Sequence, residues 1–182
     1  MTSKKRALTE GEISLAKTIF GDSIDYSKVD VHNHKISRLQ PDNFNAAPDG
    51  NLYMIKNYSD DFSKSPPEDQ AALMHELTHV WQIQNNTMNL KVAFVKETLK
   101  AKFNYRATNR YTLEPGKDLN RYGFEQQAGI VEDFVLLSNG KPPLYNQSKN
   151  HDLDGYKAAL KNIIANPAYA RREKKRIFGF EK

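Results

Sequence analysis

The residues with the clearest chemical potential form the segment His75-Glu76-Leu77-Thr78-His79, which has the pattern H-E-x-x-H. On an α-helix, side chains four positions apart project from the same face, one turn or ~5.4 Å apart. This spacing allows the imidazoles of His75 and His79 to bind one zinc ion at about 2.0–2.1 Å. Glu76 can then reach a water on the metal and act as a general base. The segment therefore predicts a catalytic metal site.

The residues before this motif predict that it lies inside a helix. Ser65-Pro66-Pro67-Glu68 is typical of a helix start, with Ser65 as the N-cap, Pro66 in the first helical position and Glu68 completing a capping box. The helix is expected to continue to about Asn85-Asn86. Helical context makes an H-E-x-x-H pattern more specific than the letters alone.

Two histidines make only half of a catalytic zinc site, which usually has three protein ligands and one open position. The metzincin pattern H-E-x-x-H-x-x-G-x-x-H is excluded, because Gln82 and Asn85 stand where it requires glycine and histidine. The chain has no cysteine, so thiolate ligands are excluded as well. The third ligand should therefore be a carboxylate from a later part of the chain.

A second strong helix, expected from about Leu119 or Asn120 to Leu137, offers that carboxylate. Glu125, in Glu125-Gln126-Gln127-Ala128, is the leading third ligand, and Glu132 is the alternative. Ala128 lies one turn on, where a small side chain lets two helices approach closely. Glu132 and Asp133 lie about two turns on, and we expect one of them, Asp133 in preference, to accept a hydrogen bond from a ligand imidazole and so to fix its tautomer.

Hydrolysis at such a site also needs a donor for the oxyanion that forms when water attacks. Tyr111 and Tyr122 are the nearest candidates in the sequence, and Tyr105 and His151 follow. For any single tyrosine, ordinary packing is the alternative role.

The remaining patterns predict an α+β fold that is mostly helical. Thr9-Glu10-Gly11-Glu12 is a capping box that opens a helix through Phe20, and Gly21 can end it. Strand patterns occur at 28–36 and 52–55, and we expect both strands to belong to one small sheet. Further helical patterns are found at 152–164 and, in part, at 87–104. His32 and His34 flank the first strand, where a surface or strand-edge role is expected rather than metal binding.

Length and composition bound the class of protein. The 182 residues suffice for one domain with a real core, which we expect to span 1–182. Hydrophobic residues make up 38%, below the roughly 45–50% of typical domains, so a modest core and a charged surface are expected. No signal peptide is recognisable, and no apolar run approaches the ~20 residues of a membrane span. We therefore expect a soluble protein that is synthesised in the cytoplasm.

The net charge of +5 comes partly from basic residues between Arg171 and Arg176. These residues predict a solvated basic helix at about 168–178. Contact with nucleic acid or an anionic surface is the less favoured interpretation.

Several segments together resemble one family, the bacterial zinc metallopeptidase-like effector domains associated with type VI secretion. Such domains occur alone or fused to valine-glycine-repeat spike proteins and Rhs proteins. The resemblance covers about residues 8–140. It is most specific in His75-Glu76-Leu77-Thr78-His79-Val80-Trp81-Gln82 and Glu125-Gln126-Gln127-Ala128, with Glu132-Asp133 closing the series. Earlier segments carry it less specifically: 8–12, 19–21, 29–33 and 48–53.

This resemblance implies a zincin-like domain of the small gluzincin type, with a small β-sheet beside the H-E-x-x-H helix. It implies His75, His79 and Glu125 as zinc ligands and Glu76 as the general base. It further implies toxicity in a competitor cell, a cognate immunity protein, a secretion-spike partner and export by a leaderless type VI route.

The sequence as a whole favours a zinc-dependent metallopeptidase that acts on a protein or peptide substrate. Its rivals are a non-catalytic zinc-stabilised interaction module, a zinc amidase acting on cell-wall peptides, and a basic protein that binds nucleic acid or the cell envelope. The strand at Leu52–Ile55 is a hypothetical partner for an extended substrate.

Overall fold

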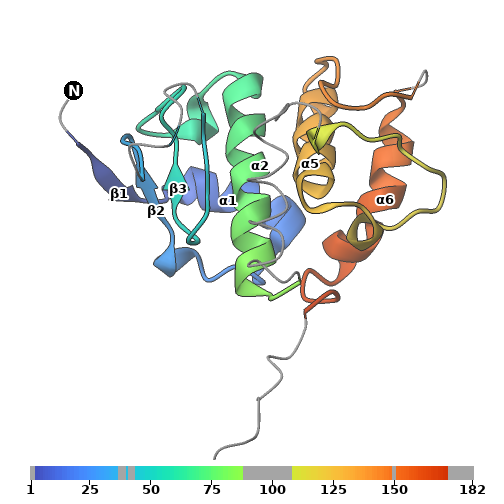
Figure 1. Ribbon diagram of the computed structural model, residues 1–182, viewed down its shortest axis with the longest axis horizontal. Helices are drawn as coiled ribbons and strands as arrows, with labels where there is room; N and C mark the ends of the chain where they lie inside the picture. Colours follow the sequence, from blue (N-terminus) through green and yellow to red (C-terminus); the bar gives the residue numbers. More distant parts are fainter. Residues whose placement is uncertain (1–2, 37–39, 41–43, 88–107, 149–150, 172–182) are drawn as a thin grey trace, which may run out of the picture.

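The computed structural model describes residues 3–36, 40, 44–87, 108–148 and 151–171. These residues form an α+β fold with four α-helices and one three-stranded sheet, as the sequence predicted. Helix α2 (Pro67–Gln84) lies in the middle. The sheet lies on one side of it, and helices α5 (Phe124–Ser138) and α6 (Leu153–Ala165) lie on the other (Figure 1). None of the described helices is long and apolar enough to cross a membrane.

The first helix, α1 (Glu10–Phe20), confirms the capping signals of the sequence. The Glu12 backbone N–H donates to Thr9 Oγ1 at 3.1 Å, and Glu12 Oε2 accepts the Thr9 backbone N–H at 2.8 Å. The helix ends at Gly21, whose φ of +48° favours a residue without a Cβ.

The same Glu12 side chain joins three parts of the fold. It is fully buried, and its two oxygens accept bonds of 2.7 and 2.8 Å from the Arg6 guanidinium. It also accepts the backbone N–H of Phe62 at 2.8 Å. Arg6 belongs to strand β1 (Lys5–Ala7), and Phe62 opens the short 3₁₀ turn Phe62–Lys64 just before α2. This carboxylate therefore helps to hold the start of α2 against the sheet.

The sheet has the order β1-β2-β3. Strand β2 (Asp30–His32) pairs antiparallel with β1 and parallel with β3 (Leu52–Tyr53). Both predicted strands exist but are shorter than expected, and β1 was not foreseen. The backbone of Tyr53 is already paired: its N–H donates to Ala46 O at 2.8 Å, and its carbonyl accepts the Ala46 N–H at 3.2 Å. The hypothesis that a substrate pairs with this strand is therefore wrong at Tyr53.

Helix α2 begins one residue later than the sequence suggested. Its N-cap is Pro66, with φ −52° and ψ 154°, and Pro67 takes the first helical position. The reason is that a residue before proline is driven into extended backbone, so Pro66 cannot be helical. The predicted capping box is therefore wrong: Ser65 Oγ bonds Ser59 Oγ at 2.9 Å, and Glu68 pairs with Lys141 at 2.9 Å.

Helix α5 also begins later than expected, at Phe124. A 3₁₀ turn at Leu119–Arg121, capped by Asp118, occupies the predicted first turn. Gly123 then serves as the N-cap, and its N–H donates to Gln126 Oε1 at 3.0 Å. Helix α6 agrees closely with its predicted range and is capped by Asp152.

Two predicted segments fall wholly or mainly outside the described residues. The partly helical stretch at 87–104 is described only at residue 87. Of the basic helix expected at about 168–178, only 168–171 are described, and they form a turn.

The Glu12 network gives a test of stability. Replacing Glu12 by alanine leaves the Arg6 guanidinium without its buried partner, so we expect a loss of about 3 kcal/mol in the free energy of unfolding. Urea denaturation followed by circular dichroism measures it. The matched control is Glu10→Ala, an exposed carboxylate of the same first turn, with an expected loss under about 0.5 kcal/mol. Equal effects of the two substitutions would contradict this role of Glu12.

Candidate metal centre

The predicted metal ligands lie between the two most closely packed helices, α2 and α5. His75 and His79 project from adjacent turns of α2, and Glu125 projects from the first turn of α5. All three are buried, with 4–6% of each residue exposed. His75 Nε2 lies 3.4 Å from Glu125 Oε2, and His79 Nε2 lies 3.4 Å from the same oxygen. Side chains from two helices that are far apart in the sequence therefore converge on one point.

These separations have the size that a metal ion requires. In a tetrahedral site the distance between two ligand atoms is about 1.6 times the bond length, or about 3.3–3.4 Å for zinc bonds of about 2.0–2.1 Å. A direct charge-assisted hydrogen bond would be shorter, about 2.7–2.9 Å. The donor atoms of His75, His79 and Glu125 all lie within 4.8 Å of one another. This group fits a metal ion.

The Nδ1 atom of each imidazole, which faces away from Glu125, lies close to an acceptor oxygen. His79 Nδ1 lies 2.9 Å from Gln82 Oε1 in a hydrogen bond, and the His79 ring stacks on Phe124 with centroids 4.4 Å apart. His75 Nδ1 lies 2.8 Å from Glu132 Oε2, although out of line with an ideal N–H direction. Acceptors at Nδ1 keep the proton there and leave Nε2 with a lone pair. Both lone pairs then face Glu125, as metal ligation requires.

The buried carboxylates make this site attractive to a cation. Burial alone would lower the pKa of His75, but Glu125 and Glu132 raise it well above its usual range. Burial opposes ionisation of Glu125, yet His79 and His75 hold its pKa well below the ordinary value. A metal ion bound here would take the place of the protons on the imidazoles, so its affinity should rise with pH.

Glu76 has the environment of a proton acceptor. It is only 4% exposed, and burial raises the pKa of its carboxyl above the ordinary value. Its Oε2 has no hydrogen-bond partner among the residues that the structure describes. A buried acceptor without a partner costs free energy, which is typical of a group kept for function.

Asp133 does not serve the imidazoles as predicted. Its carboxylate accepts the Tyr111 hydroxyl at 2.7 Å and the backbone N–H groups of Leu144, Tyr145 and Asn146 at 2.6–3.1 Å. The adjacent residue, Glu132, contacts His75 instead. The expectation for Asp133 is therefore wrong, because the segment after α5 folds back and its backbone N–H groups bond to this carboxylate.

The two favoured oxyanion donors are also engaged elsewhere. The Tyr111 hydroxyl donates to Asp133, and burial raises the pKa of Tyr111 far above its usual range. The Tyr122 hydroxyl accepts the backbone N–H of Glu114 at 2.9 Å. Neither hydroxyl is directed at the metal ligands. Of the other candidates, His151 is exposed, and Tyr105 lies outside the described residues.

Two further residues of the site were not predicted to have a role in it. Gln82 appeared as a departure from the metzincin pattern and as the last residue of the family resemblance at 75–82, and its spacing of three from His79 was a signal. Tyr145 packs its ring 6.4 Å from that of His75, and its hydroxyl interacts with Glu132. No periodicity could have identified Tyr145, because Asp133 positions it from a loop. His32 lies at the sheet as expected, stacked on Tyr53.

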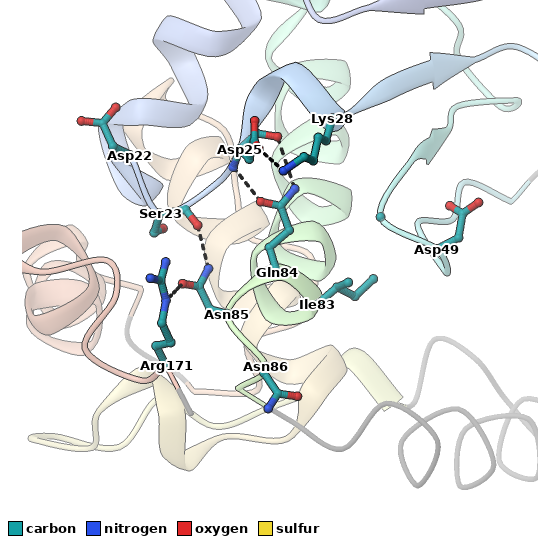
Figure 2. Close-up of a pocket in the computed structure, with 11 residues that line it drawn as sticks. Asp22, Ser23, Asp25, Lys28, Asp49, Ile83, Gln84, Asn85, Asn86 and Arg171 are labelled. Carbon is teal, nitrogen blue, oxygen red and sulfur yellow. Dashed lines mark hydrogen bonds and ion pairs between the residues drawn. The ribbon is translucent and has the colours of Figure 1, made fainter. Parts of the chain in front are cut away.

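A separate cavity of about 840 Å³ lies beyond the metal ligands, at the C-terminal end of α2. Figure 2 shows that its polar side chains bond to one another and to backbone groups of the lining residues. Gln84 contacts Asp25, and Asn85 bridges Ser23 and Arg171. The bonds of these lining side chains therefore hold the end of α2 to neighbouring segments. The cavity is distinct from the metal centre, because none of the three predicted ligands lines it.

Comparison with known proteins finds a close likeness over most of the chain. The solved effector domain of Pseudomonas aeruginosa VgrG2b matches with 39% identity and a TM-score of 0.63, over 74% of this chain and 75% of that one. The P. aeruginosa type VI secretion system spike protein VgrG2b is 40% identical over 136 residues. That match covers 74% of this chain but only 13% of the spike protein. No protein-family model matches the chain.

The adjacent carboxylates of α5 allow a matched test of these roles. We expect Asp133→Asn to lower the free energy of unfolding by about 2–4 kcal/mol, because an amide group would face several donors. Glu132→Gln should cost under about 1 kcal/mol, because its amide oxygen can still accept from His75. Urea denaturation of chelator-treated protein measures both. A larger loss for Glu132→Gln would reverse the two assignments.

Proposed function

The chain belongs to the family of the VgrG2b effector domain, and from this premise we propose that it is a type VI secretion effector with zinc-dependent metallopeptidase activity. The observation that carries the proposal is the convergence of two imidazole nitrogens on Glu125 Oε2 at 3.4 Å, beside Glu76 Oε2, which has no hydrogen-bond partner in the part of the chain that the structure describes. The first feature suits a metal, and the second suits a base. Together they support a small gluzincin-type site.

Zinc is the metal that best suits the donor set. Two imidazoles and one carboxylate are ligands of known catalytic zinc sites, and such sites leave a fourth position open. The described residues provide three clustered ligands and no fourth. A structural zinc site would be closed by four protein ligands, so this set favours catalysis over the alternative of a zinc-stabilised interaction module.

In the proposed reaction, Glu76 carries the proton. Bound zinc would supply a Lewis acid that polarises the scissile carbonyl and makes water more acidic. Glu76 Oε2 accepts a proton from the attacking water and then donates it to the nitrogen of the leaving amine. The raised pKa of Glu76 suits the first step, because a carboxylate of very low pKa is too weak a base to accept the proton of water.

The biological role follows from the relative. VgrG2b is a secretion spike protein, and its effector domain is the part that this chain matches in the solved structure. We propose that the chain travels with a secretion spike, by a route that needs no leader peptide, and is toxic in a target cell. A cognate immunity protein would then protect the producer. The substrate would be a protein, or a cell-wall peptide if the enzyme is an amidase.

Metal analysis tests the site itself. We expect purified protein dialysed against zinc to retain about one equivalent, held by His75, His79 and Glu125. His75→Ala should lose most of it, because two remaining ligands cannot hold the ion tightly. Elemental analysis measures the content. His151→Ala, an exposed histidine, is the control and should bind zinc normally. Full zinc content in His75→Ala would refute the site.

Replacing Glu76 by glutamine tests the chemistry. We expect peptide hydrolysis to fall by about 10²–10⁴-fold, because the amide cannot accept the proton of water, while zinc content stays the same. Cleavage is followed on a panel of unfolded proteins and, separately, cell-wall peptides. Glu68→Gln, an exposed carboxylate on the same helix, is the matched control. Undiminished cleavage and toxicity in Glu76→Gln would end the peptidase proposal, and cleavage of cell-wall peptides alone would support the amidase.

A further inference from the structure

We infer that Gln82 is a positioning residue that fixes the metal-binding tautomer of His79 and holds Glu125 opposite it. This inference rests on the proposed metal site. Gln82 is fully buried and follows His79 by three positions on α2, so the two side chains share one face. Its Oε1 lies 2.9 Å from His79 Nδ1.

The orientation of the Gln82 amide is settled by its surroundings. Its Nε2 donates to the backbone carbonyl of Phe124 at 3.0 Å and to Gln127 Oε1 at 3.0 Å. A carbonyl oxygen can only accept, so the amide nitrogen must face α5 and the amide oxygen must face His79. The proton of a neutral His79 imidazole is therefore on Nδ1, and its Nε2 presents a lone pair.

A second amide fixes the first. Gln127 Nε2 donates to the backbone carbonyl of Tyr122 at 2.9 Å, which leaves Gln127 Oε1 as the acceptor for Gln82. Both glutamines are thus anchored on backbone carbonyls at the start of α5. The local backbone, rather than the metal, dictates which nitrogen of His79 is free.

The same contacts hold the third ligand. Phe124 and Gln127 bracket Glu125 in the first turn of α5, and the Phe124 ring stacks on His79 at 4.4 Å. Gln82 therefore bonds to both sides of the turn that carries Glu125. One amide sets the His79 tautomer and also the 3.4 Å approach of Glu125 Oε2 to His79 Nε2.

A neutral acceptor has an advantage at this position. Glu76, Glu125 and Glu132 already place three carboxylates around the two imidazoles. A fourth carboxylate at position 82 could accept from His79 but could not donate to α5. It would also face two oxygen atoms, which is unfavourable in a buried setting. An amide supplies the acceptor and the donors without further charge.

The test reads the tautomer in metal-free protein and so needs no enzymatic activity. Long-range ¹H–¹⁵N NMR of imidazole-labelled protein, in alkaline solution where the ring is neutral, distinguishes Nδ1–H from Nε2–H. We expect His79 of the unaltered chain to show Nδ1–H alone. In Gln82→Met we expect both tautomers, and a zinc dissociation constant raised by about 10–100-fold in a competition titration.

Two further variants make the test specific. Gln84→Met removes a glutamine of the same helix whose bonds run to Asp25, and it should match the unaltered chain in tautomer and zinc affinity (Figure 2). Gln82→Glu keeps the acceptor but not the donors, so it should restore Nδ1–H while zinc binding stays weakened.

The inference is overturned if Gln82→Met keeps the Nδ1–H tautomer and normal zinc affinity, or if Gln84→Met disturbs both equally. Failure of the proposed function would look different. In that case the unaltered chain would bind no zinc or cleave nothing, while the tautomer in metal-free protein would still report on Gln82.

Discussion

The site depends on one contact between two helices: the approach of His75 Nε2 and His79 Nε2 to a single oxygen of Glu125. Two imidazole nitrogens and a carboxylate oxygen held this close need protons or a metal ion between them, and burying such a group of charges is costly in a protein interior. The fold must therefore force α2 and α5 together by other means. Apolar packing of α2, whose central residues from Leu73 to Gln82 are all buried, supplies that force.

The polar groups around the ligands divide into two sets with different roles. Gln82 Oε1 and Glu132 Oε2 lie 2.9 and 2.8 Å from the Nδ1 atoms of His79 and His75, so these two side chains face the predicted metal ligands. The Asp133 carboxylate instead accepts hydrogen bonds from the backbone N–H groups of 144–146, which places Tyr145 beside His75. Adjacent residues on α5 can divide in this way because successive side chains on a helix are rotated by about 100°. The helix thus presents one carboxylate to the metal centre and the next to a loop.

The sequence predicted what local patterns determine. The cap of α1 followed from its Thr9–Glu12 capping box, and the pairing of His75 with His79 followed from spacing, because a helix places residues four apart on one face. Prediction failed at Pro66-Pro67, where the preference of proline for the first helical position competes with the extended backbone required before a proline. It also failed where a side chain bonds to a segment that is distant in the sequence. Asp133 and Tyr111 satisfy each other across 22 positions, so no helical period could show that neither is directed at the metal ligands. Tyr145 could not be found at all for the same reason.

The departures from the metzincin pattern explain why tertiary structure is part of this site. Asn85, at the position of that pattern's third histidine, bonds instead to Ser23 and Arg171, and Gln82 bonds to α5. In the proposed site α2 supplies two ligands and α5 the third, so the two helices must be docked before the site exists. Metal binding and correct docking of α5 would then be thermodynamically linked. A chain that loses the amide contacts at Gln82 would lose metal affinity without losing any ligand.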